Sequence, residues 1–232
     1  MDLSVFNIAR FLSVQPLFTD LSVSELERLA QGCMLRRFAR AEQLFLVGEP
    51  CAEFHICVTG QVKLYVLSSA GAEKVIEIVS PGHSFAEALM FTGRPYIINA
   101  QALSDCLVLS VTKEAVESEI ARDARFALRM LAGISRRLHG LVHDVEAYSL
   151  HSGVQRVIGY LLRDIAIDEN NGERPLTVSL PVSKATIASR LSLTPEYFSR
   201  MLHELETAGL VRIDKRDIHI LDVTALANYQ SP

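Results

Sequence analysis

A series of short runs rich in β-branched and aromatic residues occupies the chain from about residue 35 to residue 112, and it limits the folds open to this chain. Turn sequences with glycine or proline separate the runs, as expected where the backbone reverses its direction between strands. Many short strands at this spacing are typical of a β-sandwich or a barrel. The runs read QLFLVGE, EFHICVTG, QVKLYVLSS, EKVIEIVS, YIINAQA and CLVLSVT.

Helical patterns flank the strand-rich region on both sides. Before it, one helix is predicted at about residues 8–14 and a second in SVSELERLAQGC, where Ser22 can cap the helix and Glu25 completes a capping box. After it, the sequence predicts a short helix in KEAVESEI and then a long helix over about residues 123–149.

The long helix carries a heptad pattern on one face. Steps of four and three residues alternate for about three heptads, as they do in a coiled-coil seam. A seam of this length needs a partner, so we expect a dimer interface; the alternative is a helix packed on its own β domain. The predicted interface residues are Leu128, Leu131, Ser135, Leu138, Val142 and Val145.

Composition and charge exclude several classes of protein. The chain has 232 residues, which suits two modest domains, and 49% of them are apolar. It has no run of about 18 apolar residues and no basic segment followed by an apolar core at its start, so we expect neither a membrane span nor a secretory signal. Irregularly spaced cysteines in apolar contexts fit reduced thiols in a cytoplasmic protein. A net charge of −4 means that any contact with nucleic acid must be local.

Residues 183–213 read SKATIASRLSLTPEYFSRMLHELETAGLVRI and predict two helices joined by a sharp turn. Ser183 can cap the first helix. Thr194 can cap the second, where Pro195 at the first position loses no hydrogen bond. This is the geometry of a helix-turn-helix. The predicted inward residues are Ile187, Ala188 and Leu191 on the first helix, and Phe198, Met201, Leu202 and Leu205 on the second.

The outward face of the second helix carries groups that can bind base edges. Arginine can donate two hydrogen bonds to guanine, glutamate can accept from the amino group of cytosine, and serine can do either. The following AGLVRIDKRDIHIL predicts a glycine turn and a two-stranded wing with cations placed to contact phosphates. An ordinary helical hairpin with a polar face is the alternative. The predicted DNA-binding residues are Thr194, Glu196, Tyr197, Ser199, Arg200, Lys215 and Arg216.

These features together predict an α+β protein in three parts. We expect an effector-sensing β domain with flanking helices over residues 1–122, a dimerisation helix over residues 123–149 and a winged helix-turn-helix domain over residues 150–232. A hinge is predicted in SLHSGVQR, where the helical pattern is interrupted. The sequence has no nucleophile elbow, phosphate-cradling glycine loop or paired metal motif, so we do not expect an enzyme.

This succession of parts resembles the CRP/FNR superfamily of bacterial transcription regulators over about residues 17–222. The resemblance implies a cyclic-nucleotide-binding-like β-roll of the jelly-roll type and a homodimer on near-palindromic double-stranded DNA, with half-sites about one helical turn apart. It also implies a contact with RNA polymerase. The segment PEYFSR matches the E-x-x-S-R pattern of the FNR and Dnr branches, whose members read a TTGAT-type half-site; by position the readers are Glu196, Ser199 and Arg200.

The same resemblance makes residues 80–102, SPGHSFAEALMFTGRPYIINAQA, the expected effector segment. Members that bind cyclic nucleotides have a glycine-glutamate pair for the ribose and a later arginine for the phosphate. Here Glu87 is kept, but Ala86 replaces the glycine, and Tyr96 and Ile97 stand where the cation is expected. A buried phosphate without a paired cation is strongly unfavourable, which argues against cyclic AMP. The sequence near the N-terminus also lacks the closely spaced cysteines of an iron–sulfur cluster.

The segments FAEALMF and INAQA are similar to the corresponding sequences of the Dnr/Nnr branch, the dissimilatory nitrate respiration regulators. Members of this branch respond to nitric oxide and are thought to use haem. The resemblance therefore implies nitric oxide, through haem in an apolar pocket, as the effector. Haem iron needs an axial ligand such as histidine. The candidate is His83 at the start of the segment, ahead of His139 and His143 on the long helix. The predicted pocket residues are Phe85, Glu87, Leu89, Met90, Phe91 and Ile97.

Two alternative functions stay open at this point. The first is a ligand-binding module of the cyclic-nucleotide type that makes no direct contact with DNA. The second is a regulator that responds to a cyclic nucleotide or to another small ligand. A DNA-binding assay separates the first from the main interpretation, and a ligand titration separates the second.

Overall fold

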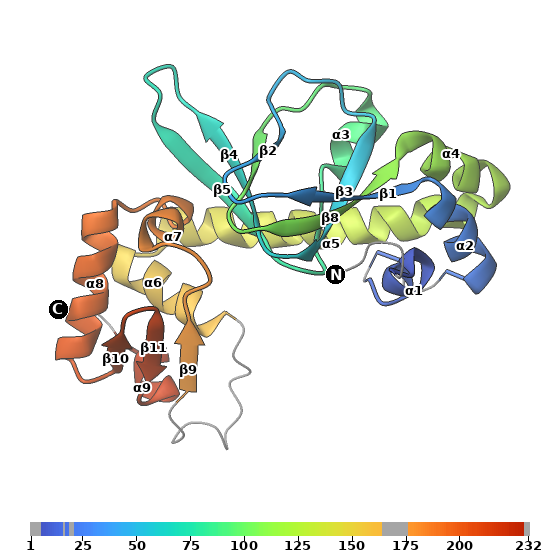
Figure 1. The fold of residues 1–232 in the computed structure, drawn as a ribbon. Helices are drawn as coiled ribbons and strands as arrows, with labels where there is room; N and C mark the ends of the chain where they lie inside the picture. The colour runs from blue at the N-terminus through green and yellow to red at the C-terminus, as the bar shows by residue number, and fades with distance from the viewer. Residues whose placement is uncertain (1–5, 16, 19–20, 164–175, 230–232) are drawn as a thin grey trace. The chain divides into compact units, whose positions relative to one another are not determined.

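The structure is a computed structural model of the chain, and it describes residues 6–15, 17–18, 21–163 and 176–229. The chain divides into two compact units, Met1–Leu141 and Val142–Pro232 (Figure 1). The first unit is rich in strands and the second in short helices, which confirms the predicted α+β class. Within the described ranges, the helices are all too short or too polar to cross a membrane.

Two antiparallel four-stranded sheets form the centre of the first unit, as the short runs of the sequence predict. Both sheets contribute side chains to one hydrophobic core, which includes Phe54, Leu64 and Val108, each at most 2% exposed. The first sheet has the order β1 (Cys33–Phe38), β8 (Cys106–Thr112), β3 (Glu53–Thr59) and β6 (Ser84–Phe85). The second has the order β2 (Gln43–Phe45), β7 (Asn99–Ala102), β4 (Val62–Leu67) and β5 (Glu73–Val79).

The turn between β3 and β4 requires a glycine. Gly60 has a φ of +78°, which side chains disfavour, and a Cβ atom added there would lie 2.7 Å from the Cβ atom of Cys106. A larger residue would therefore push β8 away from the turn. The predicted turn at Thr59-Gly60-Gln61 is confirmed.

The helices that precede and follow the sheets also form where the sequence predicts them. Before the sheets lie α1 (Ile8–Ser13) and α2 (Val23–Gln31), and the capping box of Ser22 and Glu25 at the start of α2 is present. After the sheets lie α4 (Lys113–Arg122) and the long α5 (Ala124–Leu150).

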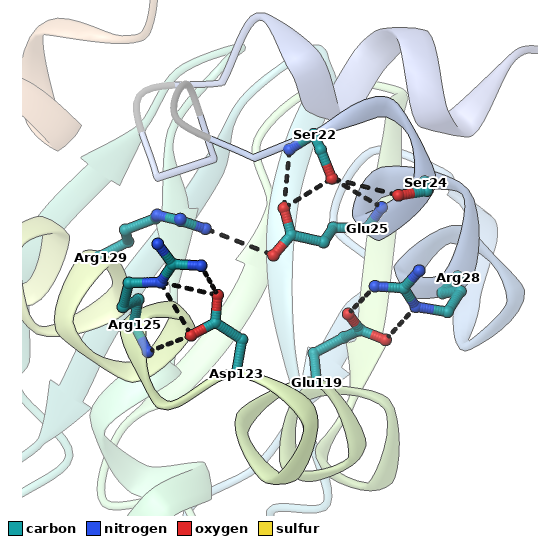
Figure 2. A network of polar contacts seen from close by, with 8 residues as sticks. All are labelled: Ser22, Ser24, Glu25, Arg28, Glu119, Asp123, Arg125 and Arg129. Carbon is teal, nitrogen blue, oxygen red and sulfur yellow. Dashed lines mark hydrogen bonds and ion pairs between the residues drawn. The ribbon is translucent and has the colours of Figure 1, made fainter.

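Charged side chains connect α2 to the two helices that follow the sheets (Figure 2). Arg28 of α2 donates two hydrogen bonds of 2.8 Å to the carboxylate of Glu119 on α4, whose side chain is only 4% exposed. Arg129 of α5 lies 3.5 Å from Glu25 of α2. A buried carboxylate is strongly unfavourable without a paired cation, so the Arg28–Glu119 pair fixes α2 beside α4.

Two faces of the long helix α5 differ in burial. Phe126 and Met130, one turn apart, are buried in the core of the first unit. The predicted heptad seam faces elsewhere and is open. Its leucines and valines are between 56% and 65% exposed, and Ser135 is exposed as well. The helix therefore packs on its own β domain through one face and leaves the seam available through another.

The second unit is a small domain around one three-stranded antiparallel sheet of order β10-β11-β9. Its first helix follows the predicted hinge, where Ser152 caps the helix and forms a capping box with Gln155. Phe198, Leu205 and Ile218 are fully buried in this unit. The elements are α6 (Gly153–Leu162), β9 (Leu176–Ser179), α7 (Lys184–Arg190), α8 (Pro195–Thr207), β10 (Val211–Asp214), β11 (Asp217–Ile220) and α9 (Val223–Ala227).

One prediction about the expected effector segment was wrong in detail. The acidic-apolar stretch of the segment forms the short helix α3 (Glu87–Thr92). The strand predicted for YIINAQA begins only at Asn99, in β7. The physical reason is that Tyr96 bonds to another loop: its N–H donates to the carbonyl of Glu49, and its carbonyl accepts from the N–H of Gly48.

Candidate nucleic-acid interface and effector segment

Two short helices of the second unit form the helix-turn-helix. The hydroxyl of Ser183 accepts a hydrogen bond of 3.1 Å from the N–H of Thr186 and so caps α7, as predicted. Ile187 and Ala188 on the inner face of α7 are fully buried. α7 packs against α8, so burial of this face sets the position of the second helix.

The turn between α7 and α8 is tight. Ser192 takes a positive φ of 56°, and the N–H of Leu193 donates back to the carbonyl of Ala188 at 2.9 Å. The hydroxyl of Thr194 accepts from the N–H of Tyr197, and Pro195 occupies the first turn of α8. The predicted cap and proline are therefore confirmed, and the hydroxyl of Thr194 is engaged in capping.

Helix α8 has one buried face and one open face. Phe198, Met201, Leu202 and Leu205 are at most 6% exposed, which confirms the predicted inward stripe. On the opposite face, three of the predicted readers are exposed to solvent in the first two turns. They are Glu196, Ser199 and Arg200.

Tyr197 lies differently from these three residues. Its ring is half-buried, and it lies against Gly153 at the start of α6: a Cβ atom added to Gly153 would overlap the ring and lie 3.0 Å from its hydroxyl oxygen. The guanidinium carbon of Arg200 lies 4.6 Å from the centre of the ring. Tyr197 thus contacts both a helix start and an exposed arginine.

Arg156 of α6 forms hydrogen bonds to the turn between α7 and α8, and sequence reasoning did not identify this role. Its Nη1 atom donates hydrogen bonds to the carbonyl oxygens of Leu191, at 2.7 Å, and of Ser192, at 3.4 Å. Leu191 is the C-cap of α7, and the last carbonyls of a helix lack the N–H donors that a further turn would supply. The contact joins residues 35 apart in the chain, so no local pattern could have revealed it.

The wing follows α8 directly. Strands β10 and β11 pair from Val211 to Ile220, and β11 also pairs with β9. Glu206 near the end of α8 accepts a hydrogen bond of 2.9 Å from the N–H of Ile213, and this bond is the main reason why the pKa of the Glu206 carboxyl is lowered. The bond ties the wing to the helix. Arg212, Lys215 and Arg216 are all exposed on the wing.

The predicted effector residues separate into a buried and an exposed group. Phe85 and Met90 are fully buried in the core, and Glu87 is 5% exposed. Leu89 is partly buried, while Phe91 and Ile97 are 39% and 61% exposed. Ala86, at the position where the family resemblance implies a glycine in members that bind cyclic nucleotides, takes a left-handed conformation with φ of 69°.

The candidate axial histidines are exposed where the structure describes their side chains. His83 is exposed, and its Nδ1 atom lies 3.3 Å from the carbonyl oxygen of Pro81. His139 is also exposed, whereas the side chain of His143 lies outside the described parts of the structure. In the described ranges, no three histidine, cysteine or acidic side chains are grouped as metal ligands would be.

His55, which sequence reasoning missed, is buried at the centre of the β domain. Its ring nitrogens lie 2.9 Å from the hydroxyl oxygen of Ser110 and 3.1 Å from that of Tyr96. The ring of Phe45 stacks on Tyr96, with centroids 3.7 Å apart. Burial, with a smaller contribution from the charge of Arg36, lowers the pKa of His55 to about 3. The histidine is therefore neutral at physiological pH and acts as a polar link within an aromatic core.

The cysteines are placed as the sequence predicts, with thiols in apolar surroundings. Cys51, Cys57 and Cys106 are buried, Cys33 is partly buried, and all four are free. Burial raises the pKa of Cys57 to about 12 and that of Cys106 to about 11. Such thiols carry almost no thiolate at neutral pH and are poor nucleophiles.

Comparison with known families accounts for both units. The cyclic nucleotide-binding domain family matches residues 35–123, and the Crp-like helix-turn-helix domain family matches residues 155–229. The first match covers the sheets and α4, and the second covers the helix-turn-helix and the wing.

Individual proteins and solved structures are similar to this chain over most of its length. The crystal structure of DNR from Pseudomonas aeruginosa superposes on this structure with a TM-score of 0.52, and the two sequences are 33% identical. The match covers 95% of this chain and 96% of that chain. The structure of FixK2 from Bradyrhizobium japonicum has a TM-score of 0.73 and covers 86% of this chain and 98% of that chain; at 24% identity it supports the fold alone. The CRP-like cAMP-activated global transcriptional regulator of Mycobacterium tuberculosis is 23% identical, over 91% of this chain and 94% of that protein.

The two domain matches follow one another in the order of the described fold, and the DNR likeness extends over nearly the whole of both chains. The chain belongs to the CRP/FNR family of DNA-binding transcription regulators.

Proposed function

We propose that this protein is a homodimeric transcription regulator of the Dnr/Nnr branch that reads a near-palindromic site with two TTGAT-type half-sites. The observation that carries the proposal is the open face of α8, where Glu196, Ser199 and Arg200 are exposed above a buried stripe. These side chains can bind base edges in the major groove. Their spacing matches the E-x-x-S-R pattern of regulators that read this half-site.

Contacts to the phosphate backbone complete the interface. Lys215 and Arg216 lie at the tip of the wing hairpin and are exposed, as is Arg212 on β10. Because the chain as a whole carries a net charge of −4, binding depends on these local cations and falls steeply with salt. Thr194 contributes as the cap that starts α8.

The dimer forms through α5. Leu128, Leu131 and Leu138 are more than half exposed on a helix whose other face already packs on the β domain. Exposed leucines at heptad spacing are typical of a coiled-coil seam. Such a dimer presents two copies of α8 to two half-sites, and RNA polymerase is the further partner that a regulator of this family implies.

Nitric oxide, through haem, is the effector that we propose to test first. When bound, haem iron supplies a coordination position for nitric oxide. The described residues fit this group in part: His83 is exposed and could offer its Nε2 atom, and Phe91 and Ile97 offer exposed apolar surface. Phe85 and Met90 do not fit, because they are wholly buried in the core.

A cyclic nucleotide is the alternative effector, since the cyclic nucleotide-binding domain family matches residues 35–123. Against it stand Tyr96, whose hydroxyl bonds to His55 rather than facing a ligand, and Ile97, which carries no charge. Ala86 already has the left-handed backbone that a glycine would adopt there. The backbone of the segment is thus compatible with a nucleotide, while its charges are not.

DNA recognition is tested by fluorescence anisotropy with a duplex that contains a TTGAT-type palindrome. We expect Arg200→Ala to weaken binding about ten- to hundredfold, because a bidentate contact to guanine contributes about 1 to 3 kcal/mol. Thr207→Ala, at the exposed far end of the same helix, is the matched control and should bind normally. No measurable binding of either the palindrome or a scrambled duplex would favour the module without DNA contact, and equal binding of the two would contradict the proposed sequence specificity.

The effector is tested by anaerobic titration with haem, followed by the absorption spectrum. We expect a stoichiometric Soret band that shifts with nitric oxide and is lost in His83→Ala but not in His139→Ala. Absence of a saturable band would contradict the haem proposal. Calorimetric titration with cyclic AMP then shows whether the alternative effector binds.

A further inference from the structure

Tyr197 occupies an unusual place among the predicted DNA-binding residues. Glu196, Ser199 and Arg200 are exposed, but the tyrosine ring between them is half-buried. It points toward the start of α6, which packs against α8 in the second unit. The far end of this ring, with its hydroxyl group, lies against the protein, so it is poorly placed to approach a base.

Gly153 is the residue against which the ring lies. It is the first residue of α6, directly after the Ser152 cap, and it is buried. The space that a Cβ atom would occupy on Gly153 is already filled by the Cε1, Cζ and hydroxyl oxygen atoms of Tyr197. The absence of a side chain at this position therefore determines where the ring can lie.

Arg200 also lies against this ring. Its guanidinium carbon is 4.6 Å from the ring centre, within the range of a cation–π contact, and the two residues are three apart on α8. An exposed arginine has many rotamers, and a stacking contact restricts them before any DNA is bound. The ring thus holds the guanidinium close to one orientation.

We propose that Tyr197 is a positioning residue that holds Arg200 for base recognition, and that Gly153 sets the position of Tyr197. The inference rests on the proposed function, in which Arg200 reads a base. It assigns Tyr197 a role different from a direct base contact. Gly153 is the first residue of α6, directly after the junction with α5. A displacement of Gly153 would therefore move the Tyr197 ring and, through the ring, change the orientation of Arg200.

The first test changes the glycine and leaves the interface untouched. In Gly153→Ala the new methyl group displaces the far end of the Tyr197 side chain, so we expect roughly tenfold weaker binding to the cognate duplex, about the worth of a well-formed cation–π contact. Gly159→Ala is the matched control: it lies in the same helix, and a Cβ atom there meets open space. We expect Gly159→Ala to bind DNA as the wild type does. Equal affinities of both variants and the wild type would overturn the inference.

The second test changes the ring itself. Tyr197→Phe retains the aromatic face and should bind the cognate duplex within about twofold of the wild type, whereas Tyr197→Leu fills the space beside Gly153 without an aromatic face and should bind roughly tenfold more weakly. Circular dichroism melts confirm that each variant is folded. A loss in Tyr197→Phe as large as in Tyr197→Leu would instead indicate a direct contact by the hydroxyl group.

A double-mutant cycle distinguishes positioning from a separate contact. If the ring acts through Arg200, Tyr197→Leu has no further effect on affinity once Arg200 is replaced by alanine. In the chain that retains Arg200, Tyr197→Leu should weaken binding only to duplexes that contain the base pair read by Arg200. Additive losses would overturn the inference while leaving the proposed function intact. If Arg200→Ala alone binds every duplex with the affinity of the wild type, the proposed function itself fails.

Discussion

The Nη1 atom of Arg156, on α6, donates a hydrogen bond of 2.7 Å to the carbonyl oxygen of Leu191, the C-cap residue of α7. The same atom reaches the next carbonyl, that of Ser192, whose positive φ starts the turn into α8. A charged donor on two carbonyls at a helix end satisfies groups that the helix leaves open. α6 thereby fixes the angle at which the reading helix leaves the turn.

Replacement of this arginine should therefore loosen the helix-turn-helix. We expect Arg156→Ala to lower the free energy of unfolding of the second unit by about 1.5 to 3 kcal/mol, the range for hydrogen bonds to charged groups. It should also weaken binding to DNA. Arg163→Ala, at the exposed end of the same helix, is the control. Urea denaturation measures the difference, and equal stabilities of the two variants would contradict this role for Arg156.

The alanine directly before α3 has a strained backbone conformation. Ala86 has a φ of 69°, a conformation that costs a residue with a Cβ atom about 1 kcal/mol or more relative to glycine. We expect Ala86→Gly to raise the free energy of unfolding of the first unit by about 1 kcal/mol. Ala88→Gly, within α3, should have the opposite sign, because glycine in a helix interior costs about 1 kcal/mol. A decrease of stability in both variants would show that the strain is not present.

The buried histidine predicts a specific response to acid. The pKa of His55 is lowered to about 3 in the folded protein, whereas an unfolded histidine titrates at about 6.5. The folded state thus binds fewer protons between these values, and its contribution is present above about pH 6.5 and lost as the pH falls toward 3. Each pH unit in this window costs about 1.4 kcal/mol.

This response is measured by comparing the wild type with His55→Gln, whose amide can still bond to Ser110 and Tyr96. We expect the wild type to lose stability relative to the variant as the pH is lowered from 6.5 to 4, in urea titrations at fixed salt. A difference that stays constant over this range would show that His55 titrates normally.

The dimer proposal predicts a monomer when the seam of α5 is charged. Leu138 is 58% exposed, so lysine there costs little within one chain but would bury a charge in a dimer. We expect Leu138→Lys to sediment as a monomer and to lose high affinity for a palindrome. His139→Lys, next to it and off the seam, should remain a dimer. A Leu138→Lys variant that is still dimeric would place the interface elsewhere.

Local patterns predicted most of the architecture, because they report on short-range physics. The capping box of Ser22 and Glu25 and the cap at Thr194 each depend on neighbours within a few residues. The inward stripe of α8 depends only on helical periodicity. Features of this kind can be read without knowledge of the tertiary structure.

The contacts that sequence reasoning missed all join distant parts of the chain. His55 meets Ser110 and Tyr96 across the β domain, and Arg156 meets a carbonyl 35 residues away. The effector segment was the least predictable, since its apolar residues could either line a pocket or fill the core. Phe85 fills the core and Ile97 faces solvent, although both read alike as apolar residues of one segment.

The measurement that tests the central claim most directly is selection of duplexes from a random pool by the full chain, followed by sequencing. The proposal predicts enrichment of two TTGAT-type half-sites whose centres lie about one helical turn apart. It also predicts that Arg200→Ala relaxes the preference at one base pair of each half-site. Enrichment of an unrelated or unpaired motif, or no enrichment at all, would contradict the account.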